Sequence, residues 1–117
     1  MNLETIATQW MRAFNAKDIE TLLALYAEDA VHYSPKLKVR EPKTEGYIRG
    51  KTQMRKWWTG AFERMPDLVY ETTALTANND RVFMEYKRIV PGEPDLLVAE
   101  VLEVAHGKIT ASRVYHG

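Results

Sequence analysis

Cysteine is absent from this chain of 117 residues, which excludes disulfides and thiolate metal sites. The three histidines, His32, His106 and His116, do not fall at a spacing that metal ligands use. We therefore expect no metal and no bound cofactor. Because disulfides mark oxidising compartments, their absence makes a cytoplasmic location the default expectation.

The chain also lacks an excess of charge of either sign. Sixteen basic residues balance sixteen acidic ones. Surfaces that bind nucleic acids or anionic membranes need a basic surplus, so the composition argues against both partners. No apolar run approaches the roughly 18 residues of a membrane-spanning helix, and the first residues lack the features of a signal peptide. Without an internal repeat or linker, residues 1–117 are expected to form one domain.

Three segments repeat apolar residues at helical spacing. The first runs from Leu3 to Phe14 after Asn2, a favourable N-cap, and the second is a short helix capped by Asp18. The third begins at Gly50 and has the clearest helical period in the chain. The second helix is predicted to carry on its apolar face Ile19, Leu22, Leu23 and Tyr26. The third carries Met54, Trp57, Trp58, Ala61, Phe62 and Met65.

Strands are predicted mainly in the second half of the chain. A short one covers Ala30–Ser34, two more cover Leu68–Thr76 and Arg81–Val90, and a hairpin with a glycine turn fills residues 95–117. Helices gathered early and strands gathered late predict an α+β fold. In such a fold a curved, mostly antiparallel sheet closes over three N-terminal helices and leaves a cone-shaped hollow.

The segment Lys36–Arg49 is the least regular part of the chain. It holds five basic residues against two acidic ones, and Pro42 and Gly46 interrupt any long element. We interpret it as a solvated loop, with Leu37 and Val39 in a short strand. The alternative is a lid that attracts an anionic ligand.

Strand alternation predicts which side chains face the hollow. The apolar ones are Val82, Met84, Leu102, Val104 and Val114. The polar ones are His32, Ser34, Tyr86, Arg88, Glu100, Ser112 and His116. Convergent polar groups inside an apolar shell are typical of a small-molecule pocket. Trp57 and Trp58 are neighbours in sequence, so only one can point fully inward; both are interpreted as core aromatics, with substrate stacking as the alternative.

Glu100 is the strongest candidate for chemistry. Desolvation would raise its pKa toward the range useful to a general acid or base, with His116 or His32 as its partner. The alternative is an internal ion pair between Glu100 and Arg88, which would be structural. Each histidine on its own is also consistent with a hydrogen-bonded structural role.

Several pieces of the chain resemble the nuclear transport factor 2-like superfamily, in its SnoaL-like and ketosteroid-isomerase-like branch. They are residues 14–18 (Phe-Asn-Ala-Lys-Asp), residues 25–31 (Leu-Tyr-Ala-Glu-Asp-Ala-Val), Gly50 before the tryptophan helix, and residues 100–104 leading to Gly107. The resemblance implies a cone-shaped α+β barrel with one pocket per subunit. It also implies a homodimer formed through the outer sheet face.

The resemblance does not carry the isomerase mechanism over intact. At the positions that would hold the family's tyrosine, catalytic aspartate and second acid, this chain has Trp10, Ser34 and Glu100. Serine cannot abstract a carbon-bound proton without an activating base. Steroid isomerisation by that mechanism is therefore disfavoured.

Two functions remain open from the sequence. The first is an enzyme of isomerase, cyclase or hydratase/hydrolase type that uses general acid/base chemistry on a small, partly hydrophobic molecule. The second is a non-catalytic ligand-binding or dimerisation module on the same fold. The predicted catalytic residues are Glu100, His116 and His32. The predicted ligand-binding residues are Trp10, Phe14, Ser34, Trp57, Trp58, Met84, Tyr86, Arg88 and Ser112. The predicted dimer face holds Phe83, Glu85, Lys87, Ile89, Val101, Glu103, Arg113 and Tyr115.

Overall fold

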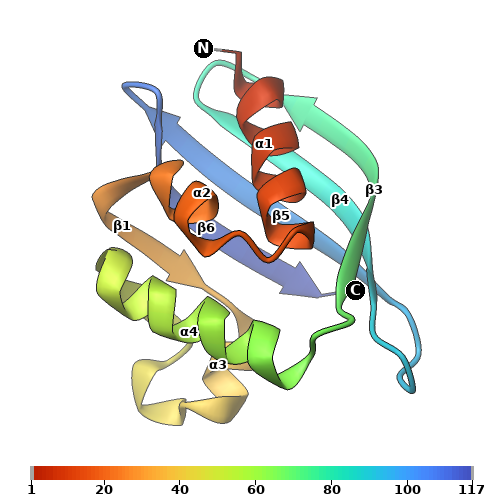
Figure 1. Ribbon diagram of the computed structural model, residues 1–117. Coiled ribbons are helices and arrows are strands. Elements are labelled where there is room, and N and C mark those ends of the chain that lie inside the picture. The colour runs from red at the N-terminus through yellow and green to blue at the C-terminus, as the bar shows by residue number, and fades with distance from the viewer. Residues whose placement is uncertain (1, 117) are drawn as a thin grey trace.

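A six-stranded sheet curves around the helices in the computed structural model, which describes residues 2–116 (Figure 1). The strand order is β2-β1-β6-β5-β4-β3, and every neighbouring pair is antiparallel except β1 and β6. The strands are β1 (Tyr26–Tyr33), β2 (Tyr47–Arg49), β3 (Val69–Ala77), β4 (Arg81–Ile89), β5 (Leu96–Ala105) and β6 (Lys108–His116). The helices are α1 (Leu3–Asn15), α2 (Ile19–Ala24), α3 (Pro35–Arg40), α4 (Gly50–Arg64) and the 3₁₀ turn η1 (Pro42–Thr44).

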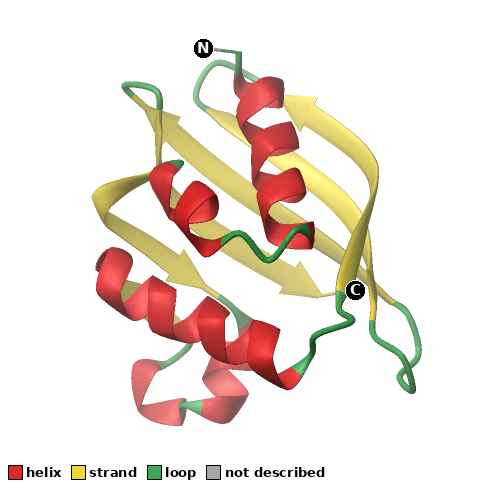
Figure 2. Cartoon of the chain, viewed as in Figure 1, coloured by secondary structure: helices red, strands yellow, loops and turns green. Residues whose placement is uncertain are grey.

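This arrangement confirms the predicted α+β fold with a curved, mostly antiparallel sheet. The helices α1, α2 and α4 lie over one face of the sheet (Figure 2). The sheet remains open, with β2 and β3 as its edges, so it forms a curved wall rather than a closed barrel. In residues 2–116, no helix combines the length and apolar character that a membrane crossing requires.

Both predicted N-caps form at the start of the chain. The Asn2 side chain accepts hydrogen bonds from the backbone N–H groups of Glu4 and Thr5, which α1 leaves without an internal partner. The Asp18 carboxylate does the same for Thr21 in α2. The placement of Tyr26 on this second helix is wrong, because α2 ends at Ala24 and Tyr26 is the first residue of β1.

The segment after β1 differs from the prediction. Residues 35–40 form the helix α3, and β2 pairs with β1, so the interpretation as a loop with a strand at Leu37 and Val39 is wrong. Ser34 caps the helix by accepting the Lys36 N–H at 3.2 Å, and Pro35 suits the first helical turn. Leu37 is fully buried and Val39 is 78% exposed. On a strand, residues two positions apart point to the same face, so this difference in burial does not fit a strand.

The predicted inward face of the sheet is the buried one. Side chains on β4, β5 and β6 mostly alternate as expected, and the buried ones include Val82, Met84, Tyr86, Arg88, Val98, Glu100, Leu102, Ser112 and Val114. Val104, next to a register shift after Glu103, and His116 are less buried than the pattern predicts. Val101, which was predicted on the outer face, is buried at 3% exposure. A stack of aromatic rings fills the space between this face and α1, because Tyr70 lies 4.1 Å from both Phe14 and Tyr86, measured between ring centroids.

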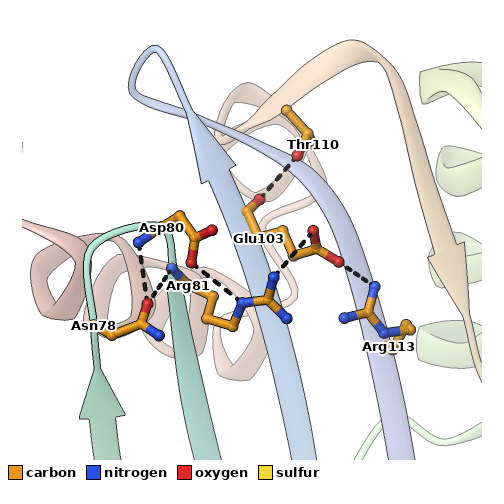
Figure 3. A network of polar contacts seen from close by, with 6 residues as sticks. All are labelled: Asn78, Asp80, Arg81, Glu103, Thr110 and Arg113. Atoms are coloured by element: carbon orange, nitrogen blue, oxygen red, sulfur yellow. Dashed lines mark hydrogen bonds and ion pairs between the residues drawn. The ribbon is translucent and has the colours of Figure 1, made fainter.

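The outer face of the sheet carries neutralised charges among exposed apolar side chains. Glu103 lies between Arg81 and Arg113 and forms an ion pair with each, as Figure 3 shows. Exposed large side chains on the same strands include Phe83 and Tyr115. The face is therefore neither purely polar nor purely apolar.

Candidate functional site

A cavity of about 420 Å³ lies between the helices and the inner face of the sheet. This volume falls within the roughly 300–1,000 Å³ that small-molecule pockets occupy. Its lining includes all three predicted catalytic residues, Glu100, His116 and His32. Of the predicted ligand-binding residues, the lining includes Trp10, Phe14, Ser34, Trp57, Trp58, Tyr86 and Arg88. Met84 and Ser112 are buried in the interior but do not line the cavity.

Glu100 is a buried carboxyl group with half of its hydrogen-bonding capacity unused. It faces inward from β5, directly opposite Met84 on β4 and Val114 on β6. Its Oε1 atom accepts a hydrogen bond of 2.8 Å from the Tyr86 hydroxyl. Its Oε2 atom is buried and has no partner among residues 2–116. A buried polar atom without a partner is uncommon and needs an explanation.

Burial determines the charge of Glu100. Desolvation raises its pKa to about 8, although the Tyr86 hydrogen bond acts in the lowering direction. At pH 7 about nine in ten molecules therefore hold the neutral acid. A neutral carboxyl group can donate a hydrogen bond, which a carboxylate cannot.

Arg88 does not neutralise Glu100, so the alternative interpretation, an ion pair between them, is wrong. The Arg88 Nη1 atom lies 3.0 Å from Glu93 Oε1, and its Nη2 atom donates to the sulfur of Met65. The sheet register explains the separation, because Glu100 lies opposite Met84, four residues along β4 from Arg88. Four residues of strand span about 13 Å, which is beyond the reach of an ion pair.

A buried chain of hydrogen bonds runs beside the cavity from α1 to β1. The Trp10 indole N–H donates to the Tyr26 hydroxyl at 3.0 Å, and this hydroxyl donates to Ser112 Oγ at 2.9 Å. Ser112 Oγ lies 2.6 Å from His32 Nδ1. This contact joins β6 to β1 and completes the chain of hydrogen bonds.

Both cavity histidines are neutral at physiological pH. Burial lowers the pKa of His32 to about 3, and its ring packs 5.2 Å from the Trp58 ring. Burial also lowers the pKa of the half-buried His116, as do the nearby charges of Lys36 and Arg88. Among the described residues, neither histidine forms a hydrogen bond with Glu100. The structure thus brings the three groups to one cavity without linking them directly.

Two positions raised by the family resemblance have local roles. Ser34 Oγ accepts the Lys36 N–H as the cap of α3, and the Trp10 N–H is used by Tyr26. Neither serves as a free acid or base. Sequence reasoning missed Tyr26, although it lies in the stretch that resembles the family, and it missed Tyr70. Tyr70 shares strand parity with the buried Leu68, which was the available signal.

Acidic and imidazole side chains do not gather into a metal site. Within the part of the chain that the structure describes, no three of them lie close enough together to hold a metal ion. His106 is exposed in the turn between β5 and β6.

The curved sheet, the helices on its inner face and the polar side chains in the hollow define a class of cone-shaped α+β pocket proteins. A family model for the SnoaL-like domain matches residues 7–112, and the chain belongs to this family. This confirms the resemblance seen in the sequence. No curated protein matches the chain.

Solved structures with the same fold include proteins of several bacteria. A SnoaL-like protein of unknown function from Burkholderia thailandensis is 26% identical, with a TM-score of 0.85, over 98% of this chain and 94% of that one. A protein from Sinorhizobium meliloti, proposed to be a polyketide cyclase, is 18% identical with a TM-score of 0.78, over 95% and 94% of the two chains. A protein from Kribbella flavida, proposed to be a ketosteroid isomerase, is 20% identical with a TM-score of 0.78, over 97% and 76%. The last two likenesses show the fold alone.

Proposed function

We propose that this protein is an enzyme that uses Glu100 as a general acid on a small, partly hydrophobic carbonyl compound. One observation carries the proposal. The Glu100 carboxyl is buried at the cavity, held on Oε1 by Tyr86 and unpartnered on Oε2. A substrate oxygen would supply the missing partner.

The chemistry follows from the protonation states. The neutral Glu100 donates its Oε2 proton toward a substrate carbonyl oxygen, and the oxygen gains electron density as a neighbouring C–H bond breaks. The carbon-bound proton passes to the neutral His116, since His32 is engaged by Ser112 and its pKa of about 3 makes it a poor base. The product of the step is an enol. Return of a proton to a different carbon gives an isomer, while attack of the enol carbon on a second carbonyl gives a cyclised product. A group that stabilises the developing oxyanion away from water has a large effect on the rate.

The fold relatives support this reaction class. Two relatives are proposed to be a polyketide cyclase and a ketosteroid isomerase, and both names denote substrates that carry ketone groups. Their low identity to this chain leaves the reaction to be tested directly.

The test begins with a ligand screen by thermal shift against hydrophobic ketones, epoxides and polyketide-like compounds. A ligand that binds only the folded state raises the melting temperature. Any ligand that binds is then assayed for turnover with the wild type, Glu100→Gln and Glu103→Gln. Glu103 is the matched control, because it lies on the same strand but pairs with Arg113 outside the cavity. Loss of about 10²–10⁴ in rate is expected for Glu100→Gln alone. Unchanged turnover in that variant would remove Glu100 as the catalyst.

A binding module without catalysis is the second candidate. The engagement of both Ser34 and Trp10 in local hydrogen bonds favours it, because two of the three positions suggested by the family are not free to react. This candidate predicts that ligands raise the melting temperature of the wild type and of Glu100→Gln without being converted by either.

We also propose that two copies associate through the outer face of the sheet. The exposed Phe83, Leu97 and Tyr115 provide apolar area, and Asp80 and Glu103 together neutralise Arg81 and Arg113. A two-fold interface uses the same patch on both subunits, and this mixed face can complement itself. Light scattering coupled to gel filtration measures the mass directly.

A further inference from the structure

Basic side chains gather at the exposed end of the cavity. Lys36 and Arg40 from α3 and Arg64 from α4 are exposed residues of its lining, whereas Glu100 is 1% exposed at the deep end. The remaining charged residues of the lining are Arg88 and Glu93, which form an ion pair with each other. Three cations are therefore left at one opening, in a chain whose basic and acidic residues are equal in number overall.

None of these three cations forms an ion pair within residues 2–116, although Glu41 lies near enough to Arg64 to attract it. No ion pair includes Lys36, Arg40 or Arg64, although other basic residues, among them Arg55 and Arg113, are paired. Burial and the neighbouring charge of Arg40 lower the pKa of Arg64, and Glu41 offsets them only in part. Like charges held side by side repel one another, so an anion that binds between them is stabilised.

The same opening exposes apolar surface. Val39 on α3 lines the cavity and is 78% exposed. The half-buried Trp57 lies beneath the Arg64 guanidinium, which is 5.6 Å from the ring centroid. An apolar ligand body would cover Val39 and Trp57 and strengthen the attraction of the cations by excluding water.

We propose that the cavity takes a small molecule with an apolar body and an anionic group, and that Lys36, Arg40 and Arg64 hold the anion at the opening. A carboxylate, sulfate or phosphate meets this description. The proposal rests on the proposed function for the deep end and adds the substrate class and its orientation. With the anion held outside, the apolar body and its carbonyl group enter toward Glu100. The reverse orientation would bury an anion beside Glu100, where no unpaired cation lies.

A matched pair of fluorescent probes tests the proposal. 8-Anilinonaphthalene-1-sulfonate and N-phenyl-1-naphthylamine share the same aromatic body, and only the first carries an anionic group. Each is titrated against the folded wild type, the variant Lys36→Gln/Arg40→Gln/Arg64→Gln, and a control variant, Lys38→Gln/Lys43→Gln/Lys56→Gln. The control removes the same charge from α3, η1 and α4 at exposed positions that do not line the cavity. All six positions are exposed, so both variants are expected to fold, and circular dichroism checks this.

The expected result is a loss of about tenfold in affinity for the sulfonate in the first variant, from three exposed charge contacts together. The neutral probe changes less than twofold, and the control variant binds both probes like the wild type. Raising the salt concentration weakens only the sulfonate, because solvent-exposed charges are screened. Equal losses for both probes, an equal loss in the control variant, or failure of the wild type to bind the sulfonate would each overturn the proposal.

The same titration separates this proposal from the function of Glu100. Glu100→Gln is expected to keep the preference for the sulfonate, since its side chain lies at the other end of the cavity. If Glu100→Gln keeps both the preference for the sulfonate over the neutral probe and an unchanged turnover, Glu100 is not the acid catalyst but the anion site is supported. Loss of turnover in Glu100→Gln without any preference for the sulfonate would do the reverse.

Discussion

Replacing Glu100 by Gln should stabilise the protein at high pH and change its stability little at low pH. The amide has nearly the shape of the protonated carboxyl group and can still pair with Tyr86, but it never ionises. In the wild type the pKa of Glu100 rises from 4.5 to about 8 on folding, because the ionised form is desolvated. A raised pKa of an acid gives a contribution to stability that is complete below 4.5 and is lost as the pH rises through 8.

The magnitude follows from that difference in pKa. At about 1.4 kcal/mol per pKa unit, the difference between 4.5 and 8 corresponds to about 5 kcal/mol of stability lost above pH 8. Small domains have roughly 5–15 kcal/mol in total, so the effect is large. The free energy of unfolding of Glu100→Gln minus that of the wild type should grow by about 1.4 kcal/mol per pH unit between pH 5 and 8.

Urea titrations from pH 4 to 9 measure this difference, with Glu103→Gln as the control for removing a carboxyl from the same strand. The control difference should not grow with pH in this range. If the Glu100→Gln difference is the same at pH 5 and pH 9, Glu100 titrates like an exposed carboxyl. The acid mechanism would then lose its physical basis.

Three further outcomes are expected. Tyr86→Phe removes the hydrogen bond that lowers the pKa of Glu100. In the same urea titrations, the pH above which the free energy of unfolding no longer falls should therefore rise by roughly one unit. No shift would mean that the hydroxyl does not act on this carboxyl. Burial lowers the pKa of His32 to about 3, so its contribution to stability is lost as the pH falls from 6.5 through 3. In His32→Asn the free energy of unfolding should therefore fall less steeply in that window, by about 1.4 kcal/mol per pH unit. If urea titrations give the same slope for the variant and the wild type, the buried neutral ring is contradicted. Phe83→Lys/Tyr115→Lys places like charges on the outer face and should convert a dimer to a monomer by light scattering, whereas a wild type that is already monomeric would refute the interface.

Local signals predicted most of the fold. The beginnings of three helices are marked by Asn2, Asp18 and Gly50, through capping and backbone preferences that act within a few residues. The strand parity of β4 to β6 followed from alternation and gave the inward position of Glu100. Helix α3 was missed because six residues carry too little periodicity, although the Ser34–Pro35 pair is a helix start signal.

The candidate site was predicted in content but not in its contacts. Glu100 and Arg88 share an inward face, and that parity alone suggested an ion pair. Which residues of β4 and β5 lie opposite each other depends on the register, which pairs Glu100 with Met84 and Arg88 with Leu96. Arg88 instead forms its ion pair with Glu93 in the turn between the two strands. The hydrogen bond from Tyr26 to Ser112 joins residues 86 positions apart, which no local pattern encodes.

The position of β6 in the sheet has a consequence for the order in which the chain can fold. This last strand lies between β1 on one side and β5 on the other, so it alone joins the β2-β1 pair to the β5-β4-β3 ribbon. During synthesis on the ribosome, β1 and β5 each keep an unpaired edge until β6 has been made. The contacts between β1 and β6 also join residues that are far apart in the sequence. Such distant contacts slow folding. A chain that lacks β6 would lack Ser112 and His116 and would leave the edges of β1 and β5 unpaired. The pairing of β6 therefore both completes the wall of the cavity and covers two edges that promote aggregation.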